Sequence, residues 1–150
     1  MKGIFWINAI DAVHGQRSME NAFDQSVWGE LCRSVEMFPP AFSCLELRTR
    51  REEFAQVEVL FSTWGMPSLT TEEIREFLPS LRAVFYAAGS VQGFARPFLQ
   101  EGIRVFSAAS ANALPVVGYT CAQILLANKG FFLACRKNRT PQVQPLRDYA

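Results

Sequence analysis

Two glycines four residues apart, Gly89 and Gly93, form the part of this sequence best suited to binding an anion. They lie in the stretch FYAAGSVQGF, directly after a run of apolar and aromatic residues. Glycine allows the backbone to approach a ligand closely, and converging backbone amides bind anions. The same pattern is typical of an ordinary turn from a strand into a helix. The stretch alone leaves both interpretations open.

Other residue types that perform chemistry are sparse. Neither G-x-G-x-x-G nor G-x-x-x-x-G-K-[ST] occurs in the chain, so the common sequence motifs for binding phosphates are absent. The single histidine, His14, could act as a general acid or base only with an orienting partner. Since spacing places no such partner, we interpret His14 as a solvated loop residue. The cysteines form no C-x-x-C pair and have no histidine nearby, so they predict neither a metal site nor a redox motif; they are Cys32, Cys44, Cys121 and Cys135.

Length and composition indicate an ordinary globular chain. Its 150 residues are enough for one domain with a core, and 49% of them are apolar. The formal net charge of +1 gives no indication of a nucleic-acid partner. After the first apolar run, Asp11 and His14 occupy the place where a signal peptide would carry small residues. Since the cysteines form no recognisable motif, a reduced, cytoplasmic location is expected.

Short apolar runs alternate with longer segments of helical spacing. The runs are hydrophobic nearly throughout, as parallel strands covered on both faces are. Thr70 and Glu73 have the spacing of a capping box, and Pro79 closes the helix that they begin. The pattern predicts the α/β class, with an open parallel sheet of about five strands and right-handed crossovers. The expected strands are 3–9, 34–39, 57–63, 82–88 and 103–109, and the expected helices are 23–34, 44–56, 70–80 and 95–102.

The segment 113–135 differs from the amphipathic helices before it because it is apolar nearly all the way round. Its length would span a bilayer, and a basic stretch, RKNR, follows it. Pro115, Gln123, Asn128 and Lys129 are a heavy polar load for a membrane span, so we expect no membrane association. A helix buried between domains or subunits has the same pattern. We therefore expect a homodimer or other self-association through 113–135, for example by exchange of helices between two chains.

The order of motifs resembles a known family from about residue 57 to residue 132, about half of the chain. The pieces VEVLFST, SLRAVFYAAGSV, EGIRVFSA, ANA and VVGYTCAQILL follow one another as in the N-terminal part of the D-isomer-specific 2-hydroxyacid dehydrogenases. Residues 1–56 match only in their alternation of strands and helices. One departure is Gly118, which replaces the glutamate of the family's helix and costs about 1 kcal/mol relative to alanine.

The resemblance implies the domain organisation of an oxidoreductase. Residues 1–110 would be a flavodoxin-like substrate-binding domain, 111–137 a long crossing or hinge helix, and 138–150 a loop leading to a Rossmann domain. These 150 residues do not include that domain, which would bind most of the NAD or NADP. The family's catalytic arginine, glutamate and histidine would also lie beyond it. We therefore expect no catalytic residue in this chain and no activity from it alone.

The resemblance also assigns roles to the loops at the carboxyl ends of the strands, where ligands of such sheets bind. In the family, backbone amides of the turn after the fourth strand hold the substrate carboxylate, which here implies Gly89, Ser90 and Val91. A carboxylate held in this way places the adjacent carbon for hydride transfer between NAD(P) and a D-2-hydroxy acid or 2-keto acid. The sequence identifies neither the substrate nor the choice between NAD and NADP.

Four further residues are candidates by the same resemblance. Trp64 and Gly65 would select the substrate side chain, although Trp64 could equally be a packed loop anchor. Asn112 and Thr120 would lie near the cofactor, although a helix cap and a buried hydroxyl are equally good interpretations. An alternative to the enzyme is a non-enzymatic α/β binding or interaction module that docks through its apolar C-terminal helix.

Overall fold

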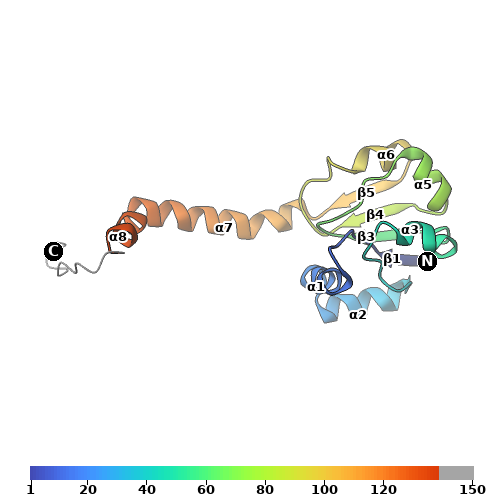
Figure 1. Ribbon diagram of the computed structural model, residues 1–150, viewed down its shortest axis with the longest axis horizontal. Helices are drawn as coiled ribbons and strands as arrows, with labels where there is room; N and C mark the ends of the chain where they lie inside the picture. The colour runs from blue at the N-terminus through green and yellow to red at the C-terminus, as the bar shows by residue number, and fades with distance from the viewer. Residues whose placement is uncertain (139–150) are drawn as a thin grey trace. The chain divides into compact units, whose positions relative to one another are not determined.

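A parallel five-stranded sheet with the order β2-β1-β3-β4-β5 organises the structure (Figure 1). The computed structural model describes residues 1–138. Each pair of neighbouring strands is parallel, with Gly3 opposite Val59 and Val84 opposite both Leu60 and Val105. The predicted α/β fold with an open parallel sheet is therefore confirmed. The strands are β1 (Lys2–Phe5), β2 (Glu36–Met37), β3 (Val59–Ser62), β4 (Ala83–Tyr86) and β5 (Arg104–Ser107).

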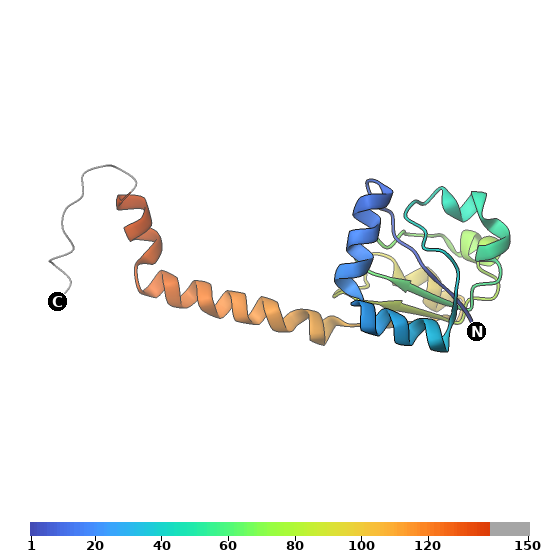
Figure 2. The ribbon, with the colours of Figure 1, turned by 90° about the horizontal axis from the view of Figure 1, so that it is seen from below.

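Helices lie on both faces of this sheet (Figure 1, Figure 2). Helices α1 (Ala12–Ala22) and α2 (Gln25–Ser34) cover one face and pack with Phe5 and Phe61. The other face, with Ile4 and Leu60, packs against four short helices. These are α3 (Glu46–Thr49), α4 (Arg51–Phe54), α5 (Thr71–Phe77) and α6 (Ala95–Gln100). Successive residues of a strand point to opposite faces, so each strand contributes to both layers of the core.

Helix α1 lies where the sequence predicts a loop. Only Gly15 and Met19 of its residues are buried, so no apolar stripe marks it in the sequence. Its start is fixed by Asp11, whose carboxylate accepts a hydrogen bond from the His14 amide at 2.9 Å. Because the helix lacks an apolar face, its sequence resembles that of a loop in spite of the capping residue.

The predicted start of α5 is confirmed in detail. Thr70 Oγ1 accepts a hydrogen bond from the Glu73 amide, and the Glu73 carboxylate accepts one from the Thr70 amide, each at 3.1 Å. Two backbone donors at the helix start are satisfied in this way. The helix ends before Leu78, the residue that precedes Pro79.

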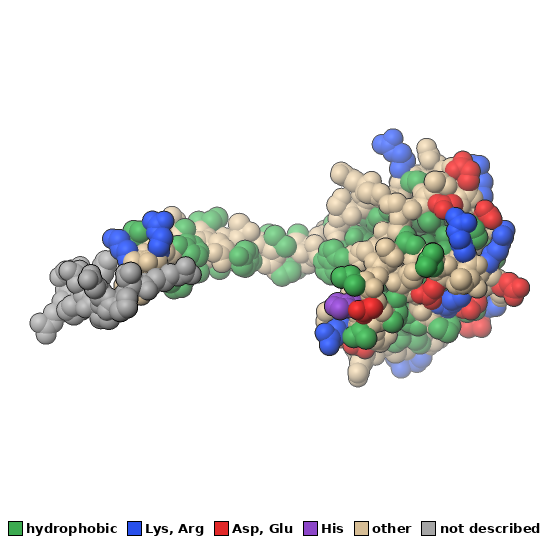
Figure 3. Space-filling view, in the orientation of Figure 1, with side chains coloured by type: hydrophobic (Ala, Val, Ile, Leu, Met, Phe, Trp, Pro, Cys, Tyr) green, Lys and Arg blue, Asp and Glu red, His purple; other side chains and the backbone are tan. Residues whose placement is uncertain are grey.

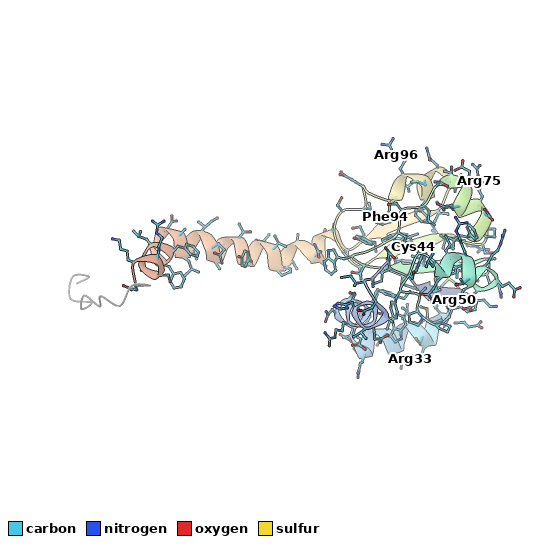
Figure 4. The ribbon with its side chains drawn as sticks, in the orientation of Figure 1. Arg33, Cys44, Arg50, Arg75, Phe94 and Arg96 are labelled. Atoms are coloured by element: carbon cyan, nitrogen blue, oxygen red, sulfur yellow. The ribbon has the colours of Figure 1, made fainter. Side chains whose placement is uncertain are left out.

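Arg50 joins α3 to α4 (Figure 4). Its guanidinium donates to the carboxylates of Glu46 at 2.9 Å and Glu53 at 2.6 Å. It also donates to the carbonyl oxygens of Pro39 at 2.7 Å and Pro40 at 3.1 Å. The hydrogen bonds from Arg50 raise its own pKa, chiefly through Glu53, and lower the pKa of Glu53. One half-buried side chain thus ties two short helices to the loop after β2.

The chain divides into two compact units, Met1–Asn112 and the part from Ala113 onward. Helix α7 (Ala109–Asn128) begins at the end of the first unit and is followed by α8 (Phe131–Lys137). Gly130, with a φ of 72°, ends one helix and begins the other in the left-handed conformation that glycine adopts readily. The long apolar helix predicted from the sequence is present as α7, but the prediction of one continuous helix over 111–137 is wrong, because the chain turns at Lys129 and Gly130 and α8 is a separate helix. Of the predicted loop 138–150, residues 139–150 lie outside the described residues.

Candidate functional site

The loops after β1 and β3 are held together at the carboxyl edge of the sheet. The Asn8 amide donates to the Gly65 carbonyl oxygen at 2.7 Å. Gly65 has a φ of 93°, and a Cβ at this position would lie 2.9 Å from the Asn8 carbonyl oxygen. Both the backbone conformation and the space therefore require glycine here. Gly65 shapes the edge of the candidate site through its backbone.

The turn after β4 presents unpaired backbone amides at the same edge. The Ala87 amide still belongs to the sheet and donates to the Ser62 carbonyl oxygen at 2.8 Å. Within residues 1–138, the next four amides donate no hydrogen bond, and they belong to Ala88, Gly89, Ser90 and Val91. Ala88 is buried, Gly89 and Val91 are half-buried, and Ser90 is exposed, so the amides that a ligand can reach are those of Gly89, Ser90 and Val91. The predicted turn therefore offers adjacent donors at the end of a strand.

Ser107, at the end of β5, orients this turn. Its Oγ lies 2.5 Å from the Gly89 carbonyl oxygen and 3.1 Å from the Ala88 carbonyl oxygen, so the hydroxyl can donate to either. It also accepts a hydrogen bond from the Ala109 amide at 3.1 Å. In a trans peptide the carbonyl and the following N–H point in opposite directions. The amides of Gly89 and Ser90 therefore face away from Ser107.

Ser107 is a site residue that the sequence did not predict. Ser107 lies one position before the N-cap of α7, so the usual preference for serine at an N-cap does not mark it in the sequence. Its contacts are to a turn 18 residues earlier and depend on the pairing of β4 with β5.

Asn112 lies beside the glycine turn. A Cβ added to Gly89 would lie 3.3 Å from Asn112 Nδ2, so the carboxamide of this side chain closes one side of the turn. Asn112 is inside α7 rather than at its first residue, and the interpretation of Asn112 as a helix cap is wrong. The structure thus brings together two predicted site residues, Gly89 and Asn112.

Thr120 belongs to the second unit and is exposed. Its hydroxyl donates to the Val116 carbonyl oxygen at 2.8 Å, one turn earlier in α7. The interpretation of Thr120 as a buried hydroxyl is therefore wrong, and its hydrogen bond is made within the helix.

Trp64 follows β3 and its side chain is 61% exposed. The interpretation of this residue as a packed loop anchor is wrong. An exposed indole next to the Gly65 turn is available for contact with a ligand.

His14 does have an orienting partner. Its Nδ1 lies 2.9 Å from Asp11 Oδ2, and at least half of each side chain is exposed to solvent. The His14 backbone amide, followed by the imidazole, lowers the pKa of Asp11 through hydrogen bonds. The predicted solvent exposure of His14 is confirmed, but the residue lies in α1 rather than in a loop. Spacing did not identify Asp11 as its partner, because the helix start that brings the two together was not predicted. The pair serves as the cap of α1.

An apolar hollow of about 290 Å³ lies on the face of the sheet that carries α1 and α2. Phe61, Phe85 and Phe106 occupy matching positions on β3, β4 and β5. Their rings stack at centroid distances of 5.4 Å and 5.0 Å. We call this hollow the aromatic groove; its lining residues are Phe23, Phe61, Phe85, Tyr86, Ala87, Phe106, Ser107 and Ala108.

A second hollow of about 480 Å³ lies at the opposite edge of the sheet, where the strands begin. Lys2, Glu58 and Arg82 give it a polar lining. Ligands of parallel α/β sheets bind at the carboxyl edge instead, so the glycine turn is the stronger candidate.

Comparison of the chain with protein-family models gives no match, and comparison with curated proteins gives none either. Helix α7 is long and apolar enough to cross a membrane by length and composition. Among the described residues, no group of three or more His, Cys, Asp or Glu side chains could hold a metal ion.

Proposed function

We propose that this chain is the substrate-binding part of an NAD- or NADP-dependent D-2-hydroxyacid dehydrogenase, and that it holds the carboxylate of a small 2-keto or 2-hydroxy acid. The observation that carries the proposal is the row of unpaired amides from Ala88 to Val91 at the carboxyl edge of the sheet. This edge is where open parallel sheets bind ligands. The motif resemblance described above supplies the reaction class.

The turn can bind a carboxylate by electrostatics and geometry. The amides of Gly89 and Ser90 point away from the hydroxyl of Ser107, which fixes the carbonyls of the same segment. Hydrogen bonds from amides to an ionised oxygen are stronger than those between neutral groups. The Asn112 carboxamide adds a donor beside Gly89. Two carboxylate oxygens held in this way leave the adjacent carbon of the acid in a fixed place.

The bound nicotinamide supplies or accepts the hydride in this reaction class. These 150 residues contain no G-x-G-x-x-G turn for the cofactor's pyrophosphate, so most of the cofactor site would lie outside them. The contribution of this chain is to bind and orient the acid, with Trp64 covering its side chain.

Amide-resolved NMR tests the proposal. Titration of the ¹⁵N-labelled chain with pyruvate, glyoxylate or hydroxypyruvate is expected to shift the amides of Ala88 to Val91 in a saturable way. Pyruvamide, which lacks the negative charge, is expected to bind at least about tenfold more weakly because a charge-assisted hydrogen bond is worth more than a neutral one. Equal shifts with pyruvamide, or saturable shifts confined to another edge of the sheet, would contradict the proposal.

Two glycine variants provide a matched comparison within the same turn. Gly89→Leu places a side chain against Asn112 and fills the space in front of the amides, whereas no atom lies within 4 Å of a Cβ added at Gly93. Gly89→Leu is expected to abolish saturable binding, and Gly93→Leu is expected to retain it. Retained affinity in a folded Gly89→Leu variant would exclude this turn as the site.

A second candidate is a non-enzymatic module that docks through its apolar C-terminal helix. The observation in its favour is that none of the residues of α7 is buried. Reading the gene past codon 150 discriminates the two. An in-frame G-x-G-x-x-G followed by Arg, Glu and His supports the dehydrogenase, and a stop codon supports the module.

A further inference from the structure

The sheet has an uncovered strip over β4 and β5. On the face that carries α1 and α2, the buried cluster includes Phe61 of β3 and Ala83 of β4. Phe23, at the end of α1, packs edge-on against Phe61 with a centroid distance of 6.3 Å. The next two rings of the stack are open, with Phe85 38% and Phe106 45% exposed. The aromatic groove therefore lacks the helix that covers such a face in a two-sided α/β sheet.

The same chain contains an apolar helix without a cover. Helix α7 has no buried residue, and no charged residue occurs between Ala109 and Asn128. Hydrophobic side chains are visible along its length (Figure 3). Its exposed large apolar residues are Leu114, Val116, Val117, Tyr119, Ile124, Leu125 and Leu126. Apolar surfaces of this extent mark interaction sites.

We infer that α7 of one copy docks in the aromatic groove of a second copy, and that the second copy returns the same contact. The residues that line the groove and those of α7 are all uncharged, so docking removes no charge from water. A helix is about 10 Å wide, which matches a strip of two strands about 4.8 Å apart.

The connection between β5 and α7 favours a second copy over the chain's own helix. Only Ala108 separates the two elements, and its amide still donates to the Tyr86 carbonyl oxygen at 3.0 Å. A helix that turns back over its own strand is normally connected by about two to six residues. Reciprocal exchange of a helix needs no such reversal. This inference does not depend on the carboxylate site.

Light scattering of two complementary variants tests the exchange. Phe106→Lys places a charge in the groove, and the double variant Leu114→Lys with Leu125→Lys places charges on the helix. Wild type is expected to be a dimer of the 16.9 kDa chain, and each variant alone a monomer at the same concentration. Mixed in equal amounts, the two variants are expected to form a heterodimer. The unchanged α7 of the groove variant can then dock in the unchanged groove of the helix variant. Its dissociation constant should be at least about tenfold lower than that of either variant alone.

Leu99→Lys is the matched control, since Leu99 is an exposed apolar residue of α6 outside both surfaces. It is expected to remain a dimer. Circular dichroism verifies folding, and Phe106→Gln replaces Phe106→Lys if the lysine prevents it. Three results overturn the inference: a monomeric wild type, a groove variant that stays dimeric, or variants that do not complement each other. Flotation of wild type with phosphatidylcholine vesicles, without dimers, would assign α7 to a membrane instead and also overturn it.

Discussion

Individual glycines in this protein are required for different structural reasons, which the sequence alone does not distinguish. Gly65 and Gly102 both have positive φ, but only Gly65 would bring a Cβ against a backbone oxygen, that of Asn8 at 2.9 Å. Gly89 has no positive φ, and a Cβ added there would lie 3.3 Å from a side-chain atom, Asn112 Nδ2, rather than against the backbone. Positive φ and close approach depend on the folded backbone, so the sequence predicts the turns but not which glycine is indispensable.

Substitution of alanine at Gly65 and at Gly102 separates the two costs. Positive φ alone costs about 1 kcal/mol at either site. Gly65→Ala must in addition move the Asn8 carbonyl, which we expect to raise the loss of unfolding free energy by a further 1 to 3 kcal/mol or so. Urea unfolding of the two variants measures the difference. Equal losses would show that the loops after β1 and β3 separate without cost.

The candidate site could be predicted in part from single residues. The glycine turn and its place at the end of a strand follow from the sequence, because apolar runs and glycines are local signals. Ser107 and the pairing of His14 with Asp11 could not be predicted. The former depends on which strands are neighbours, and the latter on a helix with only two buried residues.

At the scale of elements, short helices here depend on side chains that bridge them. Helices α3 and α4 have four residues each, too few to be stable alone. Arg50 connects both to the carbonyl groups of the preceding loop. The sequence predicts one helix over this segment, because local spacing does not reveal a break at Arg50.

Acid is expected to weaken this junction. Arg50 lowers the pKa of Glu53, so the contribution of the pair to stability is complete above the ordinary glutamate pKa of about 4.3 and is lost as pH falls through the lower folded pKa. Urea unfolding at pH 7 and pH 3 should show a smaller loss for Arg50→Gln than for wild type, since the variant lacks the pair at both pH values. The control is Arg33→Gln, which breaks only an exposed pair with Glu30 at 3.9 Å (Figure 4) and should behave as wild type. An identical pH dependence in Arg50→Gln would exclude the role assigned to Arg50.

The whole molecule shows which fold signals are readable in a sequence. The five strands were predictable because each lies within a mostly apolar run bounded by polar segments. Their order in space was not specified, and the aromatic groove exists only because that order places Phe61, Phe85 and Phe106 side by side. In the sequence, the groove corresponds to a phenylalanine at the third position of each of the segments VLFS, AVFY and RVFS.

The 150-residue chain as a whole is expected to have no dehydrogenase activity. If the chain holds substrate without most of the cofactor site, NADH mixed with it and with glyoxylate, hydroxypyruvate or pyruvate should be oxidised no faster than in buffer. The absorbance of NADH over time measures this. Turnover that increases with protein concentration would show that the 150 residues contain a complete catalytic site.

The position of β1 has a consequence for the order in which the protein folds. Although β1 comes first in the chain, it lies between β2 and β3, and Ser62 donates a hydrogen bond to Trp6 across 56 residues. During synthesis, Phe5 and Trp6 therefore stay without their main partner until β3 has left the ribosome, whereas β4 and β5 pair across about 20 residues as soon as they appear. The slow event in folding is thus expected to be the insertion of the N-terminal strand into the middle of a half-formed sheet, with its large apolar side chains exposed to solvent and to chaperones until then.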